Sequence, residues 1–189
     1  MGLDIYILRA RKPKRIKEGT LFNSSDLYRE DILFESMDKE NLDLIKELVP
    51  YGIKVKVKQE YVNKEAIAKY LGISSCRYAY IDIDNIITAC DDDYKEYTIP
   101  PEEAGKYMYT QDDDYLACEV DRVAYWRRNY EVTDFFYDNI EAKIENNGYY
   151  RLNTKILQKF NKMAAQLDSE PLPVEKPTKR VALFYTLSY

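Results

Sequence analysis

The chain has 189 residues, a net charge of −5 at pH 7 and a hydrophobic fraction of 46%. A chain of this length buries about two-thirds of the surface that it exposes when unfolded, so it can fold without disulfides or metals. The sequence contains no histidine. The lack of imidazole excludes the common catalytic triads, the HExxH metalloproteases and mixed Cys/His zinc sites. The chemistry that remains uses carboxylates, lysine, tyrosine or Mg²⁺.

The three cysteines, Cys76, Cys90 and Cys118, lie far apart and form no C-x-x-C motif. An odd number cannot pair completely within one chain, so we expect reduced thiols in a reducing compartment. The first residues carry an acid, Asp4, where a secretory signal would be basic, and no segment approaches the ~20 apolar residues of a membrane helix. The sequence therefore predicts a cytoplasmic protein that binds no membrane, and we expect no cofactor.

Tyrosine is unusually frequent, with 19 Tyr against 6 Phe. A phenol ring can be buried, but its hydroxyl needs a hydrogen-bond partner, so tyrosine suits half-buried surfaces and interfaces. This excess indicates either a binding surface or a thin-cored domain with tyrosines at its margins.

The first third of the chain contains two alternating segments. Residues 3–8 predict a strand, and a basic stretch at 9–17 predicts a loop after it. Helical spacing of leucine, isoleucine and valine predicts a helix at 38–49. Residues 53–58 alternate Ile and Val with Lys, which predicts a strand with one buried face and one row of lysines in water.

The middle third contains short elements. Asn63 is a suitable N-cap for a helix that Gly72 would end. Alternation of apolar and polar residues then predicts further strands. One short helix is predicted where a proline can occupy the first helical position, and Asp-rich segments separate these elements. The strands are expected at residues 78–84, 86–90, 94–99 and 115–120, and the short helix begins at residue 100.

The longest predicted element is an amphipathic helix from about Arg122 to Asn146. Its hydrophobic residues recur at alternating spacings of three and four, which places them on one buried stripe. They are Val123, Trp126, Tyr130, Thr133, Tyr137, Ile140 and Ile144.

The end of the chain predicts a helix at residues 154–167, a Pro-rich connector at 168–178 and a closing strand at 180–188. This strand is apolar on both faces, so we expect it inside the sheet. Together these patterns predict a single α+β domain over residues 1–189. Its mixed or mainly antiparallel sheet would pack against the long amphipathic helix and shorter helices.

Basic residues form two candidate binding sites. In the predicted loop at 9–17 they could hold phosphates or an acidic partner, although a solvated connection has the same composition. Near Trp126 they lie beside a tyrosine, and Trp and Arg are enriched in binding hot spots. Trp126 itself belongs to the predicted stripe and is expected in the core. The candidates are Arg11, Lys12, Lys14 and Arg15 in the loop, and Tyr125, Arg127 and Arg128 beside Trp126.

Acidic residues form two runs, Asp91, Asp92, Asp93 and Asp112, Asp113, Asp114, both expected in turns. Clustered carboxylates can imitate a phosphate backbone, or they can orient a protein partner against the basic loop. Asp82 and Asp84 lie two apart on a predicted strand, so their carboxylates would share one face and, with either run, could hold Mg²⁺. Solvated acids at strand ends and turns have the same pattern, and we expect no metal site.

Three segments carry a resemblance to a known family. They are Met1-Gly2-Leu3-Asp4-Ile5-Tyr6, Glu119-Val120 with Tyr125-Trp126-Arg127-Arg128, and Gly148-Tyr149-Tyr150-Arg151-Leu152. In these segments the chain resembles a family of uncharacterised bacteriophage proteins that begin with MGLD and carry a Tyr-Trp-Arg-basic motif at a helix start. The match covers about a third of the chain, and the family has no assigned activity.

The chain departs from the family pattern at two positions. Thr133 and Phe135 stand where the family usually has a His and a second Trp. If that His were catalytic, this chain would be inactive, whereas a packing residue could be replaced by Thr133. The stripe geometry favours packing.

These observations together predict a non-enzymatic phage accessory protein that binds a host protein in the host cytoplasm. Such a protein could inhibit a host defence complex such as a CRISPR-Cas system. The alternative is a nucleic-acid or nucleotide-binding protein, and the third hypothesis is a Mg²⁺-dependent nuclease that uses paired carboxylates.

Overall fold

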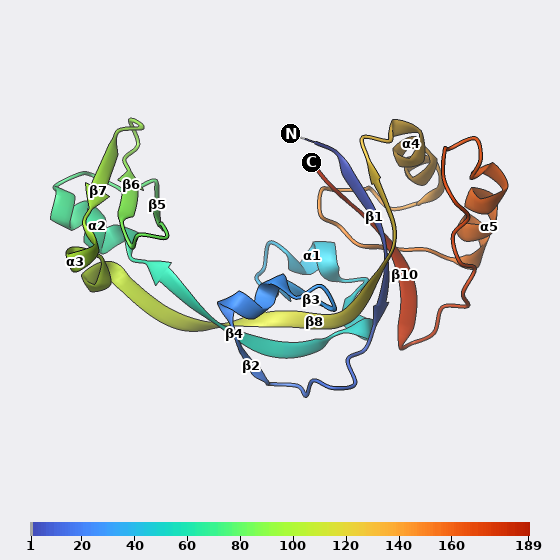
Figure 1. The fold of residues 1–189 in the computed structure, drawn as a ribbon, viewed down its shortest axis with the longest axis horizontal. Helices are drawn as coiled ribbons and strands as arrows, with labels where there is room; N and C mark the ends of the chain where they lie inside the picture. Colours follow the sequence, from blue (N-terminus) through green and yellow to red (C-terminus); the bar gives the residue numbers. More distant parts are fainter. Residues whose placement is uncertain (1) are drawn as a thin grey trace. The chain divides into compact units, whose positions relative to one another are not determined.

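The computed structural model describes residues 2–189 and contains two compact units. Unit 1 consists of residues 2–57 and 113–189, and unit 2 of residues 58–112 (Figure 1). The strands are β1 (Asp4–Arg11), β2 (Leu21–Asn23), β3 (Ile32–Ser36), β4 (Ile53–Val62), β5 (Tyr78–Ile81), β6 (Ile87–Cys90), β7 (Glu96–Ile99), β8 (Met108–Arg127), β9 (Tyr150–Arg151) and β10 (Val181–Ser188). The α-helices are α1 (Leu42–Ile45), α2 (Lys64–Leu71), α3 (Pro101–Ala104), α4 (Tyr130–Asn139) and α5 (Thr154–Met163), and the 3-10 helices are η1 (Ser24–Tyr28), η2 (Val49–Tyr51) and η3 (Gly105–Tyr107).

The larger sheet has the strand order β2-β4-β8-β1-β10-β9, and β3 pairs with β8. In its centre, β1 is antiparallel to both β10 and β8. The expected α+β class with a mixed sheet is confirmed. The closing strand is also confirmed, because β10 lies inside the sheet between β1 and β9. The single domain over residues 1–189 stays a prediction.

One face of the β1–β10 pair is covered by α4 and α5 (Figure 1). Ile5 and Ile7 of β1 are fully buried on this face. Phe136 of α4 stacks on Phe160 of α5, with 5.5 Å between ring centroids. Asn129 caps α4 through Val132 N–H and Asn153 caps α5 through Ile156 N–H, as expected for Asn at an N-cap.

The other face of the same strands packs against α1 and η2. Ala10 of β1 and Phe184 of β10 lie here, with Ile45 and Tyr51 above them. The rings of Tyr51 and Phe184 meet edge to face at 5.2 Å. The helix predicted at 38–49 is shorter than expected, since only Leu42–Ile45 is α-helical and a 3-10 turn follows at Val49–Tyr51.

The prediction of one long helix from Arg122 to Asn146 is wrong. Residues up to Arg127 belong to β8, and α4 begins only at Tyr130. Arg128 separates the two elements with a left-handed φ of 56°. Trp126 is half-buried on β8, where it pairs with Ile5 and lies 5.8 Å from the ring of Phe160.

Thr133 and Phe135 are both buried in α4. Thr133 donates a hydrogen bond from its hydroxyl to the Asn129 carbonyl, and Phe135 packs edge to face on Phe160. Thr133 and Phe135 therefore both pack in the core of unit 1, while the packing role of the family's His stays a hypothesis.

Unit 2 is a three-stranded antiparallel sheet, β5-β6-β7, with α2 and α3 beside it (Figure 1). Its core contains Ile67 of α2, Ile87 of β6 and Ile99 of β7, all fully buried. The predicted caps of α2 are confirmed, since Asn63 accepts from Ala66 N–H and Gly72 ends the helix with φ 67°.

A buried polar pair lies within unit 1. The hydroxyl of Tyr149 donates a hydrogen bond to the carboxyl group of Glu35 on β3. Burial raises the pKa of Glu35 above its usual 4.5, although the hydrogen bond from Tyr149 acts in the opposite direction. Burial likewise raises the pKa of Tyr149, and it raises that of the neighbouring Cys118 to about 12. This region is therefore an unfavourable place for a negative charge.

Replacing Phe136 with Ala should destabilise unit 1 by about 3–5 kcal/mol, because the fully buried ring would leave a cavity between α4 and α5. Trp126 is the only tryptophan, so its fluorescence reports urea unfolding of unit 1. Tyr137→Ala at the neighbouring, exposed position is the control and should change stability by less than about 1 kcal/mol. Equal losses in the two variants would contradict this account of the core.

Replacing Glu35 with Gln should change how stability depends on pH. The raised folded-state pKa means that the folded protein holds this proton more tightly than the unfolded chain. The associated stability is complete below about pH 4.5 and is lost as pH rises through the folded-state pKa. Glu35→Gln, which keeps an acceptor for Tyr149, should therefore gain stability relative to the parent protein across that window. Urea unfolding between about pH 4 and pH 8 measures the difference, and a difference that does not vary with pH would contradict the prediction.

Candidate protein-binding surface

The small sheet of unit 2 buries one face and leaves the other open. Successive strand residues point to opposite faces, so Ile87 and Ala89 of β6 face the core while Thr88 and Cys90 lie on the other face, where Cys90 is covered by neighbouring side chains. The registers β5–β6 and β6–β7 extend this outer face across all three strands. Two rows of paired residues cross this face, one residue from each strand. The first row is Tyr80, Thr88 and Thr98, and the second is Tyr78, Cys90 and Glu96.

Tyr78 and Tyr80 give the open face its aromatic character. Their rings stack at 6.4 Å, and both are exposed. The Tyr78 hydroxyl reaches Glu96 at 3.4 Å, so its ring spans the buried Cys90. A hydrogen bond with Cys90, together with burial, raises the pKa of Tyr78 to about 12. The Tyr78 hydroxyl is therefore neutral near pH 7, and the face presents aromatic rings and hydroxyl groups.

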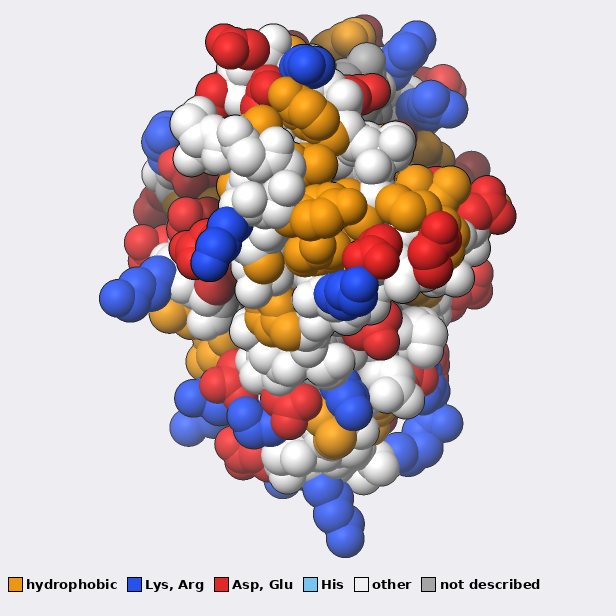
Figure 2. Space-filling view, turned by 90° about the vertical axis from the view of Figure 1, so that its left-hand side faces the viewer, with side chains coloured by type: hydrophobic (Ala, Val, Ile, Leu, Met, Phe, Trp, Pro, Cys, Tyr) orange, Lys and Arg blue, Asp and Glu red, His pale blue; other side chains and the backbone are white. Residues whose placement is uncertain are grey.

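Six large hydrophobic side chains of unit 2, including Tyr78 and Tyr80, are exposed to solvent. The set is mostly tyrosine, and the exception, Ile83 in the β5–β6 turn, is 97% exposed. Figure 2 looks onto the side where Figure 1 draws unit 2, and hydrophobic side chains gather there with acidic and basic ones around them. The exposed residues are Tyr70, Tyr78, Tyr80, Ile83, Tyr94 and Tyr109.

The net charge of the chain comes entirely from unit 2. Residues 58–112 contain eleven acids and six bases, whereas unit 1 contains 22 of each. Unit 2 therefore carries the whole net charge of −5. We define its exposed tyrosines, Ile83 and surrounding carboxylates as the unit 2 surface.

The run Asp91–Asp93 forms the β6–β7 turn, as predicted, but its members have different roles. Asp91 accepts hydrogen bonds from the N–H groups of Asp93 and Lys95 and from the Tyr97 hydroxyl. These hydrogen bonds lower the pKa of Asp91, and the one from the Lys95 N–H has the largest effect. Asp92 accepts from the Ser75 hydroxyl. Asp93 is exposed, and its carboxylate makes no hydrogen bond or ion pair within residues 2–189.

Two other expectations for acidic residues are wrong. Asp82 and Asp84 do not share a strand face, because β5 ends at Ile81 and the Asp82 carboxylate accepts from the N–H groups of Asp84 and Ile86 in the turn. Asp112, Asp113 and Asp114 do not form a turn, since they lie inside the continuous strand β8. Asp114 is paired with Lys56 at 3.3 Å.

The basic loop begins later than predicted and is partly neutralised. Arg11 is the last residue of β1 and pairs with Asp121, and Arg15 lies 3.5 Å from Asp31. Lys12 and Lys14 are exposed in the loop. The predicted basic site therefore retains two lysine side chains without an ion pair in the described chain, although the Lys14 backbone N–H donates to the Glu119 carboxylate at 2.9 Å.

Tyr125, Arg127 and Arg128 lie together at the end of β8, rather than at a helix start. The Tyr125 hydroxyl donates to Asp4 at 2.7 Å, and its ring packs on Tyr6. Arg127 and Arg128 are exposed. The structure keeps these three residues adjacent in unit 1, while Asp91–Asp93 belong to unit 2.

Sequence reasoning did not find the pocket of about 630 Å³ in unit 1, and none of the predicted site residues lines it. Its walls come from β1, β3, β8, β10 and two loops, so its residues are scattered over the sequence. Only the tyrosine excess pointed toward residues such as Tyr6 and Tyr149, without locating the pocket.

Within residues 2–189, no group of three or more His, Cys, Asp or Glu side chains is arranged to hold a metal ion. None of the helices in that range combines the length and the apolar character needed to cross a membrane. No family model, curated protein or solved structure matches the chain.

Proposed function

We propose that the chain is a phage accessory protein that acts in the host cytoplasm by docking its unit 2 surface on a basic surface of a host protein. Inhibition of a host defence complex, such as a CRISPR-Cas system, is one outcome of such binding. The proposal gives the chain no catalytic role.

The observation that carries the proposal is the coincidence of charge and exposed aromatic surface in unit 2. All of the net negative charge lies in this 58–112 segment, and its exposed hydrophobic residues are five tyrosines and Ile83. Tyrosine is enriched at the centres of protein interfaces, and complementary charge steers the encounter with a partner. A basic protein surface is the partner that fits both features.

Nucleic-acid binding is less well supported. A phosphate backbone is repelled by an acidic surface, and two of the four loop bases, Arg11 and Arg15, are paired with carboxylates. The nuclease hypothesis depended on Asp82 and Asp84 sharing a strand face, whereas Asp82 accepts turn hydrogen bonds. Protein binding is therefore the function that we propose.

The test is affinity capture from a nuclease-treated bacterial lysate, comparing the parent protein with variants of unit 2. Tyr80→Ser with Ile83→Ser removes exposed hydrophobic surface, and Asp84→Asn with Asp93→Asn removes two exposed charges. We expect the parent to retain one partner in stoichiometric amount and each double variant to retain at least tenfold less. Raising the salt from about 0.1 M to about 0.5 M should also weaken capture.

The matched control replaces two exposed tyrosines of unit 1, Tyr28→Ser with Tyr130→Ser, and should leave capture unchanged. Amide NMR spectra establish that each variant remains folded. Equal capture by the unit 2 variants and the parent, or no partner above the level of a tag-only control, would refute the proposal. A partner that is captured only when the nuclease treatment of the lysate is omitted would favour nucleic acid instead.

A further inference from the structure

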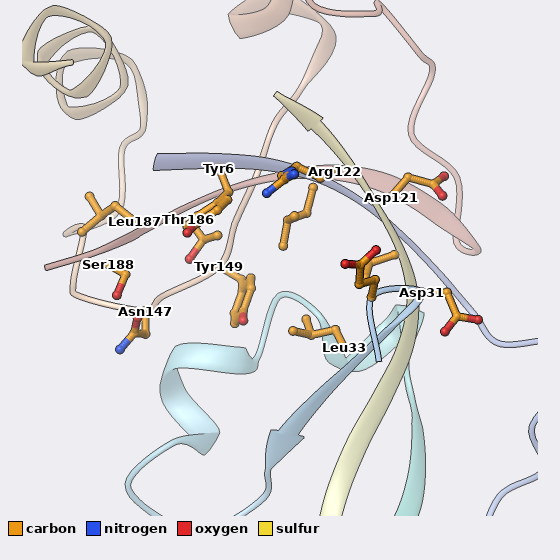
Figure 3. Close-up of a pocket in the computed structure, with 13 residues that line it drawn as sticks. Tyr6, Asp31, Leu33, Asp121, Arg122, Asn147, Tyr149, Thr186, Leu187 and Ser188 are labelled. Atoms are coloured by element: carbon orange, nitrogen blue, oxygen red, sulfur yellow. The ribbon is translucent and has the colours of Figure 1, made fainter. Parts of the chain in front are cut away.

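The pocket in unit 1 combines apolar walls with one cationic side chain (Figure 3). Its volume, about 630 Å³, is within the range of small-molecule sites. The apolar walls come from Leu8 of β1, Leu33 of β3, Val120 of β8 and Leu187 of β10. Arg122 is the only Lys or Arg among the lining residues.

A bulge in β8 places Arg122 in the pocket. In the β1–β8 pairing Ile7 lies opposite Ala124, but Leu8 lies opposite Arg122, so Val123 is the extra residue. A bulge of one residue reverses the face that all following side chains occupy. Arg122 therefore shares the face of Leu8, and Asp121 shares the face of Arg9. Figure 3 accordingly shows Arg122 near Tyr6 and Thr186, and Asp121 apart from them.

Two of the carboxylates that line the pocket, those of Asp121 and Asp31, are already paired with other arginines. Asp121 pairs with Arg9 at 3.5 Å and also with Arg11. Asp31 pairs with Arg29 at 3.2 Å, and this contact lowers the pKa of Asp31. Arg122 has no ion pair within residues 2–189, and its guanidinium lies 5.6 Å from the ring centroid of Tyr125.

Two residues with hydroxyl groups, Tyr6 and Thr186, line the pocket together with Arg122. Tyr6 pairs with Thr186 across the β1–β10 ladder, so both side chains are on the pocket face. Neither hydroxyl makes a side-chain hydrogen bond within the described part of the chain. The guanidinium and the two hydroxyls are together suited to bind the oxygens of one anionic group.

The opposite side of the pocket disfavours a second negative charge. Glu30 lines it there without an ion pair in residues 2–189, and the half-buried Glu35 lies two residues beyond Leu33 on the same face of β3. A ligand that carries several phosphates would be repelled by the Glu30 carboxylate and would meet the Glu35 environment, which disfavours negative charge. The complementary ligand has one anionic group and an apolar body.

We propose that the pocket binds a small organic monoanion with an aromatic body, whose acidic group is held by Arg122 with Tyr6 and Thr186. The rings of the ligand contact Leu8, Leu33 and Val120, and its charge replaces the missing ion-pair partner of Arg122. This site lies in unit 1 and is independent of docking through unit 2.

The test uses the fluorescent probe 8-anilino-1-naphthalenesulfonate, a monoanion with aromatic rings. Titration should show saturable binding of one equivalent, and Arg122→Gln should weaken it at least tenfold because the sulfonate loses its cation. N-phenyl-1-naphthylamine has the same rings without the sulfonate. Its binding should be weaker and should change less than threefold in Arg122→Gln.

Arg127→Gln is the matched control, because Arg127 is exposed on the same strand but does not line the pocket. The affinity of this variant for the probe should equal that of the parent protein. NMR of the parent protein locates the probe without any substitution. The methyl signals of Leu8, Leu33, Val120 and Leu187 should shift, and unshifted signals would overturn the proposal. It is likewise overturned if Arg122→Gln and Arg127→Gln have equal effects, or if the two probes respond equally to Arg122→Gln.

Discussion

The hydrogen bonding of β1 on both edges is the constraint on which unit 1 depends. Its eight residues pair with β10 on one side and with β8 on the other. Because strand side chains alternate, this double pairing requires two covered faces. Ile5 and Ile7 face α4 and α5, while Tyr6, Leu8 and Ala10 face the opposite side. The first helices and loops cover this second face only in part, and the uncovered part is the pocket.

Local sequence patterns were sufficient wherever one element determines its own structure. The Ile/Val and Lys alternation of residues 53–58 lies in β4, with Val55 and Val57 buried and the lysines exposed. Asn63 and Gly72 determine the ends of α2 through their own side-chain and backbone chemistry. The closing strand was predictable because its apolar residues occupy both faces, and both faces of β10 are buried.

The segment 122–146 could not be assigned from its spacing, because contacts with distant residues determine its structure. Val123 and Trp126 fit a helical stripe, yet Trp126 pairs with Ile5 and Val123 is the bulge residue. β-Branched and aromatic residues such as these also favour strands. The pair Arg128-Asn129 was the missed local signal, since Asn129 is a typical N-cap and α4 begins directly after it. The same bulge determines that Arg122 faces the pocket of unit 1. The sequence therefore did not reveal this pocket, because the pairing of β8 with β1 that positions Arg122 could not be predicted either.

The two units divide the electrostatics of the chain between them. In unit 1 the numbers of acids and bases are equal, and Arg9, Arg11 and Arg29 are paired with Asp121 and Asp31. Arg122 is distinctive because it lines the pocket and has no ion pair within the described residues. In unit 2 the acids outnumber the bases, and carboxylates such as that of Asp93 remain exposed. A single unpaired cation in a pocket suits a small anion, whereas an acidic surface with exposed tyrosines suits a large basic partner. The charged features of the chain are therefore an acidic surface in unit 2 and one cationic pocket in unit 1, rather than acidic runs that act together with the basic loop.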